Sequence, residues 1–210
     1  MELDHVVIAV ADLEAAAEEI ETRYGLASIE GGRHPGWGTA NRIIPLGETY
    51  LELVAVVDAA EAAGSDFGRR VASGVSDVAR PLGWVVRTDE LEKTARRLGL
   101  SVGAGSRALA DGRTLRWRYA GIEEPSADPS LPFFIQWAPE TALPGRAEVT
   151  HRAGRARISK LVLKGDPDRV AAWLGGHALP IVVHRGLPAV AAVVISTAAE
   201  EIVLGEDRRS

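Results

Sequence analysis

The chain has 210 residues, enough for one large domain or two small ones with a substantial apolar core. Its net charge of -5 gives no reason to expect nucleic acid or an anionic membrane as a partner, and its longest apolar run is too short to span a bilayer. The absence of cysteine excludes disulfides, thiolate metal sites and cysteine nucleophiles. The first residues lack the basic and apolar regions of a signal peptide, so we expect a cytoplasmic protein.

The first 57 residues predict a strand, a helix and three more strands. Leu3–Val10 is rich in β-branched residues and predicts a buried strand. Alternation places His5 on one face and Val6, Ile8 and Val10 on the other, which we expect to pack under a helix. Asp12 is the expected N-cap of a helix over residues 13–24. Strands over 26–29, 39–46 and 50–57 follow, and the glycine-rich residues 31–38 between them predict a loop.

The same order of elements recurs twice. A connector over 58–80, with a helix near 67–72, leads to a second unit at 81–138, and a linker over 139–156 leads to a third unit at 157–210. In the second unit we predict strands at 82–87, 100–106, 114–120 and 132–137 around a helix at 90–98. In the third we predict strands at 158–163, 181–184, 189–197 and 200–204, with a helix at 167–174.

Glu52 lies among apolar residues on a predicted strand. A buried carboxylate is costly unless it is paired or functional, and burial would raise its pKa toward the range useful for a general base. The alternative is that this strand lies at an exposed edge and that Glu52 is solvated.

Two further segments carry candidate ligand-binding residues. In the segment 31–41, His34, Trp37 and Asn41 could contact a ligand, or the segment could be a turn in which Trp37 fills the core. In the strand 114–120, Arg116 and Arg118 share a face that could clamp a carboxylate or phosphate, or could simply face solvent. Arg107, ahead of that strand, is another candidate.

Several of these segments together resemble a known family. They are Leu3–Val10 followed by Asp12, the segment 31–41, Tyr50-Leu51-Glu52-Leu53, residues 115–118 and 132–137, and the spacing of His151 and Gly154. They are similar to the glyoxalase-like branch of the vicinal oxygen chelate superfamily. The resemblance implies an α+β fold in which two βαβββ modules curl around a cup that holds the site. The third unit is then a degenerate module of the same kind.

The resemblance also implies positions for metal ligands on the first and fourth strands of each module. His5 and Glu52 match these positions in the first module, and Trp84 and Gln136 match them in the second. Tryptophan cannot bind a metal and glutamine binds weakly, so half of the ligand shell is altered. One divalent ion remains a candidate cofactor, with His34 or His151 as a third ligand to complete two histidines and one carboxylate. Alternatively, His5 is a core histidine bonded to a carboxylate.

These implications lead to a functional expectation with two alternatives. We expect a glyoxalase-like enzyme, of lyase, isomerase or dioxygenase type, that acts on a small carbonyl or carboxylate compound through His5 and Glu52. The first alternative is a non-catalytic small-molecule binder, which Trp84 and Gln136 favour. The second is a dimeric scaffold whose site has decayed. We also expect a homodimer, because the third unit leaves an apolar strand, 189–197, that needs cover.

Overall fold

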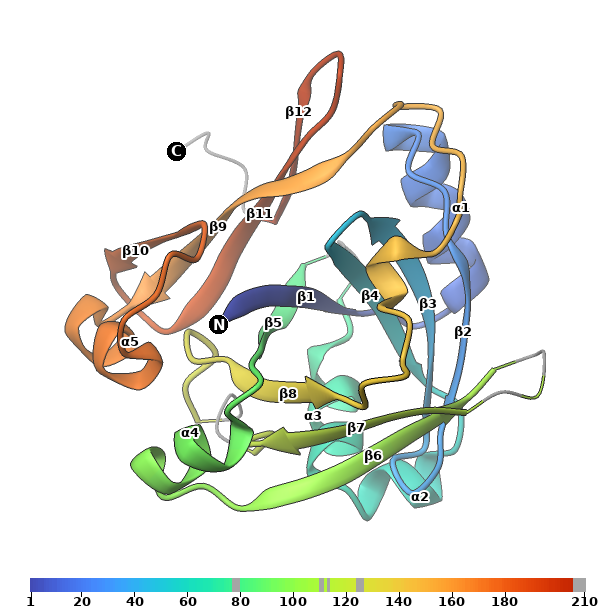
Figure 1. Cartoon of the computed structure of the whole chain (residues 1–210). Helices are drawn as coiled ribbons and strands as arrows, with labels where there is room; N and C mark the ends of the chain where they lie inside the picture. The colour runs from blue at the N-terminus through green and yellow to red at the C-terminus, as the bar shows by residue number, and fades with distance from the viewer. Residues whose placement is uncertain (77–79, 110–111, 113, 124–126, 206–210) are drawn as a thin grey trace.

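The computed structural model describes residues 1–76, 80–109, 112, 114–123 and 127–205. Two βαβββ modules close into one barrel with the strand order β1-β4-β3-β2-β6-β7-β8-β5, and a separate sheet of four strands lies against it (Figure 1). This confirms the predicted α+β class and the paired modules, although the cup is a closed barrel. Among the helices described, none is long and apolar enough to cross a membrane.

The first module consists of β1 (Glu2–Ala9), α1 (Leu13–Tyr24), β2 (Ile29–His34), β3 (Thr39–Leu46) and β4 (Thr49–Val56). Asp12 caps α1 by accepting a hydrogen bond from the Ala15 amide, as predicted, and Gly25 ends the helix with a φ of 69°. The first strand, β1, pairs with the fourth, β4, in parallel.

The second module repeats this pairing. After α2 (Ala59–Ala63) and α3 (Asp66–Gly74) come β5 (Pro81–Arg87), α4 (Leu91–Leu98), β6 (Val102–Ala108), β7 (Thr114–Ala120) and β8 (Phe133–Trp137). Strands β5 and β8 are parallel, as β1 and β4 are. The modules join through the antiparallel pair β1–β5 on one side and through Arg33 opposite Ala108 of β6 on the other, which closes the barrel.

The third unit has the predicted element order but a different pairing. A 3-10 turn, η2 (Pro144–Arg146), precedes β9 (Arg157–Gly165), α5 (Pro167–Leu174), β10 (Ile181–Arg185), β11 (Ala189–Ser196) and β12 (Glu201–Gly205). Here the first strand, β9, lies between the second and third, in the order β10-β9-β11-β12. Val193 and Ile195 of β11 are fully buried in the same core cluster as Trp84 of β5. One face of β11 is thus covered by its own chain, and the homodimer stays a prediction.

Two apolar clusters lie on opposite sides of the barrel wall. Val6, Ile8 and Val10 pack outside it with Ala17 and Ile20 of α1, as predicted. The residues between them along β1 face inward, where they join an aromatic-rich cluster inside the barrel, made of Val7, Ala9, Val54, Phe67, Val71, Val85, Trp117, Ile122, Phe133 and Ile135. Because side chains on a strand alternate, this places His5 inside the barrel.

Candidate functional site

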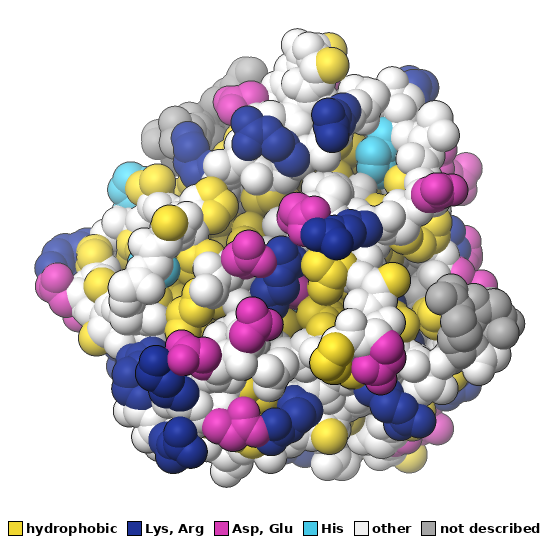
Figure 2. All heavy atoms as spheres, viewed as in Figure 1, with side chains coloured by type: hydrophobic (Ala, Val, Ile, Leu, Met, Phe, Trp, Pro, Cys, Tyr) yellow, Lys and Arg dark blue, Asp and Glu magenta, His cyan; other side chains and the backbone are white. Residues whose placement is uncertain are grey.

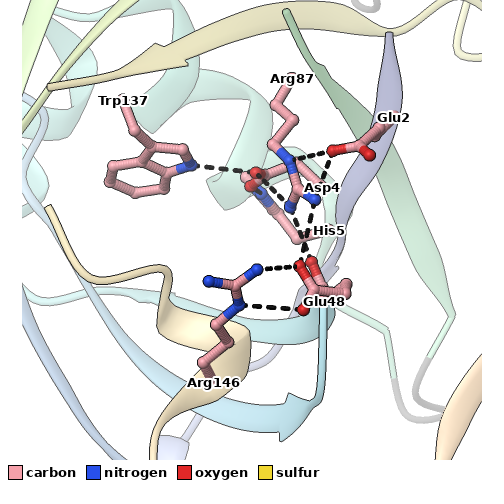
Figure 3. Close-up of polar contacts among 7 residues, drawn as sticks. All are labelled: Glu2, Asp4, His5, Glu48, Arg87, Trp137 and Arg146. Carbon is pink, nitrogen blue, oxygen red and sulfur yellow. Dashed lines mark hydrogen bonds and ion pairs between the residues drawn. The ribbon is translucent and has the colours of Figure 1, made fainter. Parts of the chain in front are cut away.

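A bulge in β1 brings two neighbouring polar side chains to the inside of the barrel. Leu3 lies opposite Val86 of β5 and His5 lies opposite Val85, so Asp4 is the extra residue. In a regular strand Asp4 and His5 would point to opposite faces. Instead, His5 Nδ1 lies 2.6 Å from Asp4 Oδ1, and the other Asp4 oxygen accepts a hydrogen bond of 2.9 Å from Trp137 Nε1 (Figure 3).

Glu52 of β4 meets the other side of the His5 ring. Its Oε2 lies 3.5 Å from His5 Nε2, and its Oε1 accepts a hydrogen bond of 2.5 Å from Asn41 Nδ2 of β3. The Tyr50 ring stacks on His5 with 4.4 Å between the ring centres. Glu52 is only 6% exposed, which excludes the alternative of a solvated edge.

His5 and Glu52 form a buried ion pair. Burial disfavours the charged imidazolium, but the hydrogen bond and charge of Asp4 together with Glu52 outweigh it and raise the pKa of His5 to about 9. Burial likewise disfavours the carboxylate, but His5, with His34 and Asn41, lowers the pKa of Glu52 to about 2. At neutral pH His5 is therefore protonated and Glu52 ionised. The expectation that burial raises the pKa of Glu52 was wrong, because it ignored the cation beside it.

His34 stands on the other side of Glu52. Its Nε2 lies 3.7 Å from Glu52 Oε1 and 3.3 Å from Asn41 Nδ2, while its Nδ1 lies 3.0 Å from the Thr39 hydroxyl. Burial, with the charge of Arg107 assisting it, lowers the pKa of His34 to about 4 against the opposing effect of Glu52. His34 is therefore neutral at pH 7, and its Nε2 is free to accept from Asn41 when Nδ1 carries the proton.

The segment 31–41 is mostly strand and not the predicted loop. Residues 29–34 and 39–46 pair as β2 and β3, and only 35–38 form the turn between them. A Cβ at Gly31 would lie 2.0 Å from Asn41 Oδ1, so glycine is required where β2 passes this side chain. Periodicity failed here because two adjacent glycines carry no side-chain pattern.

Arg107 of β6 brings a cation to the same place. It is 4% exposed, and its Nε has no hydrogen-bond partner among the described residues. The guanidinium is always charged, and a buried charge without a full set of partners is costly. An anionic ligand would supply the missing partner.

These residues surround a small space that we call the inner cavity. Its polar lining is His5, His34, Tyr50, Glu52 and Arg107, and its apolar lining is Trp37, Phe67, Trp117, Phe133, Ile135 and Trp137. Its volume is about 30 Å³, room for a water molecule or the small end of a ligand. Trp37 thus both fills the core and borders the site.

The structure places Trp84 and Gln136 elsewhere. Trp84 is fully buried outside the barrel wall, where its Nε1 donates to the Ser130 carbonyl, and Gln136 donates to the Asp89 carbonyl near the surface. The inward positions are their neighbours Val85 and Ile135. Our prediction was wrong by one residue on each strand, and such a slip moves a side chain to the opposite face.

Three further candidates also lie away from the inner cavity. Arg116 and Arg118 are exposed on the outer face of β7, where Arg118 pairs with Glu92, as the solvated alternative expected. His151 fastens the linker to the first module: its Nδ1 accepts from the Ala27 amide and its Nε2 donates to the Pro45 carbonyl at 2.7 Å.

Sequence reasoning missed Asp4, Tyr50 and Thr39. Asp4 carried a usable signal, since two consecutive charged or polar residues at 4 and 5 on an apolar strand are unusual unless they contact one another. Tyr50 and Thr39 carried none, because both are ordinary strand residues whose role depends on what lies across the barrel.

The residues present do not fit the metal centre that the resemblance implied. Val85 and Ile135, at the two positions of the second module, cannot bind a metal. His5, His34 and Glu52 come together, but the Asn41 amide group lies against both Glu52 Oε1 and His34 Nε2 and uses their lone pairs. Among the residues that the structure describes, no group of three or more His, Cys, Asp or Glu side chains is arranged to hold a metal ion.

Comparisons with known proteins agree with this architecture. No curated protein matches the sequence. A hypothetical protein from Staphylococcus aureus shares the fold, with a TM-score of 0.71 and 14% identity over 95% of this chain and 92% of that one. Methylmalonyl-CoA epimerases of Mycobacterium tuberculosis and Streptomyces coelicolor match 66% of this chain, and 88% and 97% of their own, with TM-scores of 0.45 and 0.46 and identities of 18% and 17%.

The model of the family described as "Glyoxalase-like domain" matches residues 3–178, which include both modules, every residue of the inner cavity and the linker. The chain therefore belongs to the glyoxalase-like domain family.

Proposed function

We propose that this protein is an enzyme that moves a proton at the carbon next to a carbonyl group in a small organic anion. One observation carries the proposal: His5, which Asp4 holds, lines the same cavity as Glu52 and Arg107, and Arg107 Nε has no hydrogen-bond partner among the described residues. Paired acid and base groups beside an anion-binding residue are what such a proton transfer needs.

In this scheme Arg107 holds a carboxylate of the substrate and Glu52 removes the proton. The 3.5 Å between His5 Nε2 and Glu52 Oε2 is longer than a strong hydrogen bond, so Oε2 can reach a substrate proton. The electron pair of the broken C–H bond moves to the carbonyl oxygen, and the His5 imidazolium stabilises that oxygen or protonates it. Asp4 holds His5 in its charged form, and Asn41 orients Glu52.

No resident metal has a step in this scheme, because the donor set does not fit one. In it His5 meets the charge that develops on the carbonyl oxygen, and Arg107 holds the carboxylate. This makes the proposal sensitive to the protonation of His5, whose pKa is raised to about 9 so that it is available as an acid at neutral pH.

One observation favours the alternative of a non-catalytic binder of small organic anions. A Glu52 carboxylate with a pKa of about 2 is a weak base, as long as the ion pair with His5 stays intact. The aromatic lining of the inner cavity would serve binding equally well. The two functions share Arg107 and differ in whether Glu52 accepts a proton.

Deuterium exchange separates them. The protein is incubated with 2-oxobutyrate in D₂O, and loss of the C3 proton signal is followed by NMR against a protein-free sample. We expect catalysed exchange that Glu52→Gln abolishes, while the exposed Glu18→Gln on α1 leaves it unchanged. If 2-oxobutyrate and longer 2-oxo acids bind without exchange, or if Glu52→Gln retains full exchange, the enzyme proposal fails.

A further inference from the structure

A second, larger cavity opens directly outside the inner one. We call it the outer cavity. It has a volume of about 460 Å³, in the range of sites for whole organic ligands, and its apolar lining includes Ile43, Leu109, Leu115, Leu143 and Pro144. Arg107 lines both cavities, which places this residue between them.

Strand geometry makes the two cavities one continuous path inside the barrel. Ile43 follows Asn41 by two residues on β3 and lies opposite Glu52 in the β3–β4 ladder. Leu115 precedes Trp117 by two residues on β7 and packs against the same inner cluster. Since residues two apart on a strand share a face, Ile43 and Leu115 continue the wall that bears the inner residues.

Part of the linker forms the outer side of this cavity. We call residues 142–148 the strap; it includes η2 and crosses in front of β3 and β4 (Figure 1). Gly47 donates a hydrogen bond of 3.0 Å to the Gly145 carbonyl, and a Cβ at Gly145 would lie 2.3 Å from the Thr49 carbonyl oxygen. The strap therefore packs closely against the β3–β4 turn.

An ion-pair network ties the strap to the polar site. Arg146 binds both carboxylate oxygens of Glu48, at 2.9 and 2.8 Å (Figure 3). Arg87 of β5 donates to the Glu48 carbonyl at 2.7 Å and lies 3.8 Å from Asp4 Oδ2. The strap is thus held in place beside the residues that hold His5.

The charges of the outer cavity lie at its rim. Glu30, Arg146 and Glu148 are exposed, whereas the buried charge, Arg107, is at the inner end. On the face seen in Figure 2, hydrophobic side chains are visible between scattered acidic and basic ones. A ligand in this path meets a cation at one end of its site and an apolar wall along the rest.

We propose that the ligand is an amphipathic carboxylate, with its carboxylate and the reacting atoms next to it at Arg107 and the inner cavity and an aliphatic or aromatic body under the strap. This rests on the proposed function for the identity of the reacting atoms. The size difference supports it, since about 30 Å³ accepts only a few atoms and about 460 Å³ accepts the remainder.

Binding of acetate, butyrate, octanoate and neutral octanamide by calorimetry tests the proposal. Burial of one methylene corresponds to about fourfold in affinity, so we expect octanoate to bind at least about tenfold more tightly than butyrate. Octanamide should bind at least about tenfold more weakly than octanoate, and Arg107→Met should remove that difference. Affinity that does not rise with chain length, or an amide that binds as tightly as the acid, overturns the proposal.

Two matched variants locate the apolar body. Leu115→Trp fills the outer cavity and should weaken octanoate at least about tenfold. Leu187→Trp makes the same exchange at a residue that is 87% exposed, and should change nothing. Unchanged octanoate affinity in a folded Leu115→Trp variant contradicts the assignment, and the chain-length series on the unmodified protein stands if that variant does not fold.

Exchange assays with 2-oxobutyrate and 2-oxooctanoate distinguish the two proposals. If both hold, both compounds exchange and the longer one has the higher kcat/KM. If only the proposed function fails, octanoate still binds better than butyrate but neither 2-oxo acid exchanges. If only this inference fails, 2-oxobutyrate exchanges through Glu52 and chain length improves neither affinity nor kcat/KM.

Discussion

The buried imidazolium of His5 should make the stability of this protein fall as the pH rises above neutrality. The pKa of His5 is raised from 6.5 to about 9 in the folded protein. Its contribution is therefore fully present below pH 6.5 and is lost as the pH rises to about 9. At about 1.36 kcal/mol for each pH unit, the loss over this interval is about 3 kcal/mol.

Urea unfolding at pH 6, 7, 8 and 9, followed by tryptophan fluorescence, measures this loss. Wild-type protein should lose about 1 kcal/mol of unfolding free energy per pH unit between pH 7 and 9. His5→Gln should be less stable throughout, because it leaves Asp4 and Glu52 buried without their cation, and should lose the decline in stability above pH 7. His151→Gln removes a histidine that bonds to the Ala27 amide and the Pro45 carbonyl and not to Asp4 or Glu52, and should keep the wild-type slope.

Two outcomes would refute this reasoning. The first is a wild-type stability that does not change between pH 6.5 and 9. The second is a His5→Gln variant with the wild-type slope, which would assign the proton to another group. If His5→Gln does not fold, an NMR titration of the His5 ring in the wild-type protein gives the same answer directly, and an ordinary histidine pKa there would contradict the buried ion pair.

Two further predictions concern packing and metal content. Gly105→Ala should lower the free energy of unfolding by about 1–3 kcal/mol, because the added Cβ would lie 2.5 Å from the Trp117 indole. The control Gly176→Ala, which has no atom within 4 Å of the added Cβ, should lower it by less than about 1 kcal/mol. Equal unfolding free energies for the two variants would contradict the tight packing of β6 on β7. Elemental analysis of the purified protein should find well under one zinc, iron, manganese or nickel ion per chain, and added metal should not raise the exchange rate of 2-oxobutyrate. A stoichiometric metal that falls on His5→Gln substitution would show that Asn41 turns away from Glu52 and His34 to admit it.

The inward-facing sides of β1 and β4 could be predicted from the sequence, because each strand has a polar residue among apolar ones that shows which side faces inward. His5 and Glu52 interrupt apolar strands, so alternation and the cost of burying a charge identify the same inward side. Helix α1 was predicted with its bounds for a similar local reason. Asp12 and Gly25 define its ends through hydrogen bonds within a few residues.

The inward-facing sides of β5 and β8 could not be identified in this way. Trp84 and Val85 are both fully buried, since one packs under the four-stranded sheet of the third unit and the other inside the barrel. Phe134 and Ile135 show the same ambiguity on β8. When both faces of a strand are covered, alternation cannot distinguish them, and this is why Trp84 and Gln136 were assigned to the wrong side.

The sequence by itself determined most helices and strands, though not α2, and the inward faces of His5 and Glu52, because caps, turns and alternation act over a few residues. Only the tertiary structure decided that Asp4 turns inward, since its bulge depends on the register of β1 against β5. It also decided that Arg107 is buried and that Asn41 links Glu52 to His34. These contacts join strands far apart in the chain, and their pairing follows from closure of the whole barrel, which no local pattern encodes.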